Sequence, residues 1–137
     1  MIDSPIVRAH AQAATGQKRG SCDQTLGRSR GGLTSKWHIA VDTPRRPVRF
    51  ILTAGNASDP KLGIPLLTGL PAQNVLADKA YDSYAILDFV EASGAQPIIP
   101  QRVCMPRKRA FDPAKYKLRN HIERTIGRLK RLRRIAT

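Results

Sequence analysis

The spacing of short apolar segments between proline, glycine and helix-capping residues constrains the fold of this chain more than any other feature. Residues 37–41 and 48–53 alternate as β-strands do, and the proline-containing stretch 44–47 separates them. This pattern predicts an antiparallel hairpin. A further β-branched run, Ile2 with residues 6–7, lies at the N-terminus and predicts another strand.

Two amphipathic segments and two short apolar runs follow the hairpin. One helix is expected to begin at Pro60 and end near Gly69, and a second is expected to close at Gly94. The candidate N-caps are Ser58 or Asp59 for the first helix and Asp82 or Ser83 for the second. Residues 75–77 and 96–99 predict short buried strands. A hairpin followed by alternating helices and strands favours an α/β fold with a mixed sheet flanked by helices.

The remaining segments complete what we expect to be a single domain over residues 1–137. Residues 14–35 form a Gly-, Arg- and Ser-rich loop in this interpretation, residues 101–113 form a basic loop, and residues 114–137 form a long terminal helix. Within the first loop, residues 28–32 either hold a phosphate through backbone amides or form a plain turn. Cys22 and Cys104 are interpreted as ordinary thiols in a reducing compartment.

The formal net charge of +14 is concentrated at the C-terminal end. Residues 102–137 carry thirteen Lys or Arg against two Asp or Glu, whereas residues 50–101 carry two against five. A field this one-sided favours a polyanionic partner, and nucleic acid is the common one. The basic tail lacks a Trp or Phe face that would favour a membrane surface. No apolar run is long enough to cross a bilayer, so we expect a soluble, cytoplasmic protein.

The expected terminal helix separates polar and apolar residues onto different faces. At about 100° per residue, four polar side chains share a stripe roughly 60° wide beside the apolar face. The polar residues are Tyr116, Arg119, Glu123 and Lys130, and the apolar face consists of Leu118, Ile122, Thr125, Ile126, Leu129 and Leu132. The simpler interpretation of Arg119 and Glu123 is an ordinary surface pair one helical turn apart.

Two further acids lie where a carboxylate can serve a site. Asp78 directly follows the expected strand 75–77, and the carboxyl ends of strands in α/β sheets commonly line a ligand crevice. Asp3 lies within the first β-like run, where burial is costly unless the carboxylate binds a cation or a donor. The alternatives are a turn or cap residue for Asp78 and a solvent-exposed terminal residue for Asp3.

These residues resemble those of a known family. Tyr116, Arg119, Glu123 and Lys130 reproduce the Tyr-x2-Arg-x3-Glu-x6-Lys signature of DDE transposases from insertion-sequence families four and five. The segments 119–124 and 128–137 resemble the same region of these enzymes, 78–83 resembles their Asp-(Arg/Lys)-Gly-Tyr-Asp segment, 1–10 resembles the segment with their first catalytic Asp, and 27–34 and 55–59 are also similar. The resemblance covers nearly the whole chain in matching order.

The resemblance implies a fold, a metal site and DNA contacts. The expected fold is ribonuclease-H-like, truncated at both ends. Asp3, Asp78 and Glu123 would be the catalytic, metal-binding triad for two Mg²⁺ or Mn²⁺ ions, and Tyr116, Arg119 and Lys130 would contact DNA near the cleaved end. We assign the other basic residues of the C-terminal region, Arg107, Lys108, Arg109, Arg131, Arg133 and Arg134, to sequence-independent binding of the DNA backbone, with a merely solvated helix end as the alternative.

The implied activity is metal-dependent cleavage and strand transfer of insertion-sequence DNA ends. The implied partners are terminal inverted repeats, target DNA, a second copy of the chain in a synaptic complex, and a DNA-binding region encoded by an upstream frame. The implied location is the bacterial cytoplasm, in association with the nucleoid. The sequence departs from the family at Pro5, where the pattern has Thr, and at Ala80, where it has Gly. Alternatives are an inactive DNA-binding remnant and a nuclease of the same fold without strand transfer.

Overall fold

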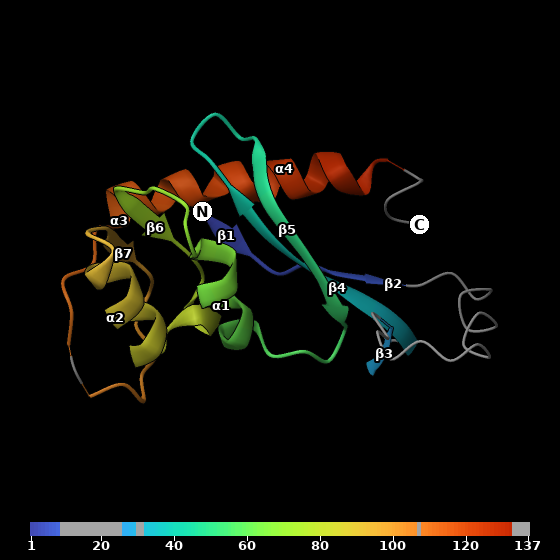
Figure 1. Ribbon diagram of the computed structural model, residues 1–137, viewed down its shortest axis with the longest axis horizontal. Helices are drawn as coiled ribbons and strands as arrows, with labels where there is room; N and C mark the ends of the chain where they lie inside the picture. The colour runs from blue at the N-terminus through green and yellow to red at the C-terminus, as the bar shows by residue number, and fades with distance from the viewer. Residues whose placement is uncertain (9–25, 30–31, 107, 133–137) are drawn as a thin grey trace.

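The computed structural model describes residues 1–8, 26–29, 32–106 and 108–132. It is a mixed α/β structure in which helices lie on both sides of the strands (Figure 1). The elements, with η denoting a single 3-10 turn, are β1 (Ile2–Asp3), β2 (Ile6–Arg8), β3 (Gly27–Ser29), β4 (Gly32–Val41), β5 (Pro47–Ala54), α1 (Asp59–Leu67), β6 (Asn74–Leu76), η2 (Lys79–Tyr81), α2 (Tyr84–Ala92), β7 (Gln96–Ile98), α3 (Pro113–Tyr116), η3 (Lys117–Arg119) and α4 (Asn120–Lys130).

The larger sheet is antiparallel and is built around β4, which pairs with β1, β2, β3 and β5. The predicted hairpin is confirmed, with Ile39 opposite Phe50 in the β4–β5 ladder. Across the other ladders of β4, Asp3 lies opposite Ile39 and Ile6 lies opposite Lys36. β1 and β2 therefore keep one continuous register, although Pro5 separates them.

The turn of the β4–β5 hairpin lies slightly earlier in the chain than expected. The backbone NH of Arg45 donates to the carbonyl of Asp42, and Arg45 has a positive φ of 70°. The Asp42 carboxylate accepts from the backbone NH of Arg46 and forms an ion pair with its guanidinium. Pro47 already belongs to β5, so the predicted turn over 44–47 ended one residue too late.

The smaller sheet contains two parallel strands, β6 and β7, joined through α2. Both strands and the intervening helix are confirmed. The cap of α2 is Ser83, whose hydroxyl accepts from the backbone NH of Ile86, and Gly94 ends this region with a φ of +77°. For α1 the N-cap is Ser58, and Arg49 of β5 donates to three carbonyls at the other end of the helix.

Two apolar clusters lie on opposite faces of the larger sheet. Because side chains alternate along a strand, Ile2 and Ala40 face α1 and α2, whereas Met1, Ile39 and Val41 face α4. Figure 1 shows α4 crossing one face of the β4–β5 hairpin and α1 on the other side. The first cluster contains Leu66, Val75, Ala77, Tyr81, Ile86, Leu87, Val90 and Ile99, and the second contains Ile122 and Ile126.

Two sequence predictions are corrected. The expected loop over 14–35 ends too late, because β3 and the first four residues of β4 fall inside it and extend the hairpin ladder; residues 14–25 lie outside the described residues. The expected terminal helix is interrupted by the 3-10 turn η3, and α4 ends at Lys130. Leu118 and Leu132 were expected to be buried, but they are 45% and 52% exposed because the sheet extends under only the middle of the helix.

Among the described residues, no helix combines the length and the apolar character needed to span a bilayer. Cys104 is a free, exposed thiol, and Cys22 lies outside the described residues.

Candidate active site

Asp3 lies at the end of β1, on the face of the sheet that α4 covers. The alternation along β1 that turns Ile2 toward α1 turns Asp3 toward the opposite side. Its side chain is 20% exposed, and its Oδ1 accepts from the backbone NH of Ser4 at 2.8 Å. Pro5 does not displace it, because the Pro5 carbonyl still accepts from the NH of Trp37 at 3.0 Å.

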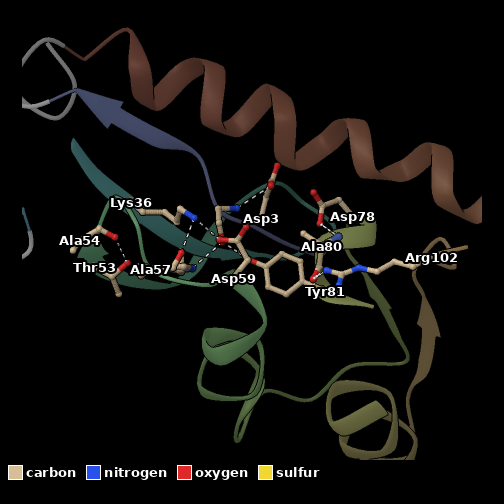
Figure 2. Close-up of polar contacts among 12 residues, drawn as sticks. Asp3, Lys36, Thr53, Ala54, Ala57, Asp59, Asp78, Ala80, Tyr81 and Arg102 are labelled. Atoms are coloured by element: carbon tan, nitrogen blue, oxygen red, sulfur yellow. Dashed lines mark hydrogen bonds and ion pairs between the residues drawn. The ribbon is translucent and has the colours of Figure 1, made fainter. Parts of the chain in front are cut away.

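Asp78 lies two residues after β6 and caps the 3-10 turn η2. Its Oδ1 accepts from the backbone NH of Ala80 at 2.8 Å, which leaves Oδ2 available. In Figure 2, Asp3 and Asp78 both lie beneath the terminal helix. Ala80 belongs to η2, and Arg45 is the only non-glycine with positive φ in the described part of the chain, so alanine fits at position 80 without backbone strain.

Arg119 joins the third acid to the first. Its Nη1 donates to Glu123 Oε1 at 2.5 Å, and its Nη2 donates to Asp3 Oδ2 at 3.0 Å. The i, i+4 pair between Arg119 and Glu123 therefore exists, but it is more than a surface pair. The same guanidinium, 17% exposed, holds a carboxylate that is 116 positions away in the sequence.

The three acids are close enough to affect one another electrostatically. Burial raises the pKa of Asp3 above its ordinary value, the Ser4 NH and Arg119 oppose this shift, and the negative charges of Asp78 and Glu123 add to it. Burial also raises the pKa of Tyr116, which Arg119 lowers and the same three carboxylates raise. Tyr116 stacks obliquely against Phe111, with ring centroids 5.3 Å apart. The fold thus brings Asp3, Asp78, Glu123 and Tyr116 around Arg119.

The carboxylates do not form a closed metal site as they stand. In the part of the chain that the structure describes, no three His, Cys, Asp or Glu side chains are close enough to share one metal ion. Arg119 already provides the positive charge between Asp3 and Glu123. The donor set is nonetheless all carboxylate oxygen, which is what Mg²⁺ and Mn²⁺ prefer, and it already accommodates a cationic group.

The other expected DNA-binding residues fall into different environments. Lys108, Lys130 and Arg131 are exposed. Arg109 is not free, because its Nη1 lies 2.7 Å from Asp82 Oδ1 in an ion pair whose acid is fully buried. The remaining three, Arg107, Arg133 and Arg134, lie outside the described residues.

The contacts that Arg102 and Arg109 make around Asp82 were not predicted from the sequence, where Asp82 was considered only as a helix cap. Its Oδ2 accepts from the backbone NH of Arg102 at 2.6 Å. The Arg102 guanidinium donates to the carbonyls of Lys79 and Ala80 at 2.7 and 2.5 Å, and Figure 2 shows it reaching this turn. The basic loop therefore holds η2, the turn that carries Asp78.

A second row of cations lies on the terminal helix, and of its members only Arg131 was predicted to bind DNA. Its members share one outward face, because their spacings of seven, four and three residues are helical. They are Lys117, Arg124, Arg128 and Arg131, which we call the outer stripe. All four are exposed, and none forms an ion pair with another described residue. On the helical projection this stripe adjoins the side that carries Arg119 and Glu123.

The chain is similar to known proteins of one family. The family model described as "Transposase DDE domain" matches residues 1–137. A Brucella ovis protein named as a transposase for the insertion sequence element IS6501 is 35% identical over 109 residues, which cover 76% of this chain and 82% of that protein. No solved structure matches the chain significantly. The family match spans every residue from the first acid to the terminal helix, and the chain belongs to the DDE transposase family of insertion sequences.

Proposed function

We propose that this transposase domain cleaves insertion-sequence DNA ends and joins them to target DNA, with Asp3, Asp78 and Glu123 as the catalytic metal ligands. We further propose that the mixed α/β structure is ribonuclease-H-like. A hairpin-centred antiparallel sheet, a parallel pair joined through a helix, and a terminal helix across one face support this fold.

One observation carries the proposal. The Arg119 guanidinium contacts both Asp3 and Glu123, which come from opposite ends of the chain. Costly burial of Asp3 next to two further acids has no evident structural benefit. An acidic cluster inside a strongly basic protein is instead what divalent-metal catalysis on a polyanion requires.

The carboxylate oxygens that do not accept these local backbone hydrogen bonds would hold the metal. Asp3 Oδ1 and Asp78 Oδ1 each accept a backbone NH, which fixes the orientation of both carboxylates. Glu123 is the most exposed of the three, at 54% of its side chain, and therefore faces the side from which DNA would approach. Two Mg²⁺ or Mn²⁺ ions bound there would activate the attacking oxygen and stabilise the leaving oxygen of an in-line displacement.

The chain's own cations would hold the DNA. Arg119, bound to two carboxylates, is placed to neutralise a phosphate beside them, and its planar fork suits bidentate contact. Lys130 and Tyr116 would position the same strand, and the outer stripe would bind the flanking backbone without reading sequence. The proposed partners are terminal inverted repeats, target DNA, a second copy of the chain and an upstream-frame DNA-binding region.

Mn²⁺ calorimetry on the wild type, Asp78→Asn and Glu123→Gln tests the metal ligands. Each substitution should weaken binding at least tenfold, because each removes one charged oxygen ligand. Glu91→Gln, which removes an exposed acid from α2, is the matched control and should bind as the wild type does. Equal Mn²⁺ affinity in all four proteins would refute the proposal.

Incubation with labelled element ends and a target plasmid separates the remaining candidates. A transposase joins the two DNAs, a nuclease of the same architecture only nicks them, and an inactive remnant binds DNA without metal-dependent cleavage.

A further inference from the structure

The two acids belong to segments from different sheets, because Asp3 ends β1 and Asp78 follows β6. β1 belongs to the larger sheet and β6 to the smaller one, and no backbone ladder joins the two sheets within the described residues. Backbone pairing therefore does not fix the distance between the two carboxylates. Side chains within three residues of each acid make this connection instead.

A buried row of hydrogen bonds runs from one segment to the other. Tyr81, three residues after Asp78, bonds through its hydroxyl to the Ser4 hydroxyl, next to Asp3. The Ser4 Oγ also lies 2.8 Å from His38 Nδ1, across the ladder between the N-terminal strands and β4. On the other side of the ring, His38 Nε2 lies 2.8 Å from the Oγ1 of Thr53 on β5.

The donors and acceptors in this row can be satisfied in one direction. The Thr53 hydroxyl donates to the Ala54 carbonyl at 3.3 Å (Figure 2). The Thr53 oxygen can therefore accept the proton of His38 Nε2. His38 Nδ1 then accepts from the Ser4 hydroxyl, and Ser4 in turn accepts from the Tyr81 hydroxyl. Every hydroxyl hydrogen and the imidazole NH has an acceptor.

Two side chains of the row lie in the interior, and the other two, Ser4 and Thr53, are half-buried. His38 is completely buried and Tyr81 is 1% exposed. Burial lowers the pKa of His38, which keeps the ring neutral as this direction of donation requires. A buried polar group left without its partner is costly, so the row strongly favours one spacing between the two segments. The backbone NH of Tyr81 also donates to the carbonyl of Asp78 at 3.1 Å, which ties the row to the second acid.

We propose that Tyr81, Ser4 and His38 are positioning residues that set the separation of Asp3 and Asp78 by joining their two segments through the sheet. None of the three contacts metal or DNA in this account. The inference rests on the proposed role of the acids as metal ligands. Removing a residue that orients a metal ligand without contacting the metal commonly lowers metal affinity by ten- to a hundredfold.

The test compares Mn²⁺ affinity, measured by calorimetry well below the melting temperature, in Tyr81→Phe and Ser4→Ala. Tyr81→Phe keeps the ring in the core and removes only the hydroxyl, so we expect about a tenfold or greater loss of affinity. Ser4→Ala should lose a similar factor, and Ser4→Thr, which keeps a hydroxyl, should restore most of it. The Mn²⁺ concentration for half-maximal DNA nicking should shift in parallel.

Thr125→Val is the matched control for stability. Thr125 is 5% exposed, its hydroxyl donates to the His121 and Arg45 carbonyls, and it lies on α4 outside the row. This variant should be destabilised and should still bind Mn²⁺ as the wild type does. If Tyr81→Phe and Ser4→Ala bind as the wild type while Glu123→Gln does not, the positioning role is refuted and the metal ligands stand. If Glu123→Gln also binds as the wild type does, the proposed function fails as well.

Discussion

Replacing Arg109 by Met tests whether a basic residue near the candidate site serves the fold rather than DNA. Met retains much of the apolar stem of Arg109 and removes the guanidinium that faces the fully buried carboxylate of Asp82. Removing one partner of a buried ion pair generally costs about 3–5 kcal/mol. Asp82 keeps one hydrogen bond, from the backbone NH of Arg102, so the lower end, about 3 kcal/mol, applies.

The expected shift in melting temperature follows from the size of the protein. For a chain of 137 residues, an unfolding entropy of about 2.1 cal/mol/K per residue converts about 3 kcal/mol into a decrease of roughly 10 °C. Thermal unfolding followed by circular dichroism at pH 7 measures this decrease. The matched control is Lys108→Met, one residue away and exposed, for which the change should stay within about 0.5 kcal/mol.

Binding to a DNA duplex at several salt concentrations completes the comparison. If Lys108 contacts a phosphate, its replacement lowers the slope of log affinity against log salt by about 0.9, whereas Arg109→Met leaves the slope unchanged below its melting temperature. The reasoning would be wrong if Arg109→Met melted within about 2 °C of the Lys108 variant and lowered the salt slope as well. That result would mean that the guanidinium is available to DNA.

Two further variants test features of the hairpin and of the terminal helix. Arg45→Gly should raise the melting temperature by roughly 3 °C in thermal unfolding, because a positive φ costs about 1 kcal/mol for a residue with a side chain, and an unchanged or lower value would contradict this. Arg124→Gln combined with Arg128→Gln should lower the salt slope for duplex binding by about 1.8 and leave the Mn²⁺ affinity unchanged, whereas an unaltered slope would remove the outer stripe from the DNA interface.

The elements were predictable where local chemistry determines them. The alternation of residues 37–41, the Ser83 cap and the glycine at position 94 are local signals, and the structure confirms the elements they predicted. The start of β4 was missed because Gly32 and its neighbours lack a strong β pattern and become a strand through pairing with β3. Long-range pairing outweighs local propensity there.

The residues of the candidate site could be proposed from the sequence, but the hydrogen bonds and ion pairs among them could not. Helical spacing placed Arg119 beside Glu123, and the structure adds that the same guanidinium also reaches Asp3. The residues behind the acids gave no comparable signal. His38 has no motif around it in the sequence, and only the ladder between the N-terminal strands and β4 places it next to Ser4. Arg109 resembled a DNA-binding residue because a charge count does not reveal a buried partner.

The bridge made by Arg119 has a consequence for how the protein exists before it meets its substrate. If only a metal ion neutralised a cluster of carboxylates, the negative charges would repel one another in the metal-free chain. Folding would then depend on the concentration of the ion. Here a counter-ion encoded in the sequence occupies that role from the outset. If the three acids bind magnesium as proposed above, the ion would meet a positive charge that the folded domain already holds between Asp3 and Glu123.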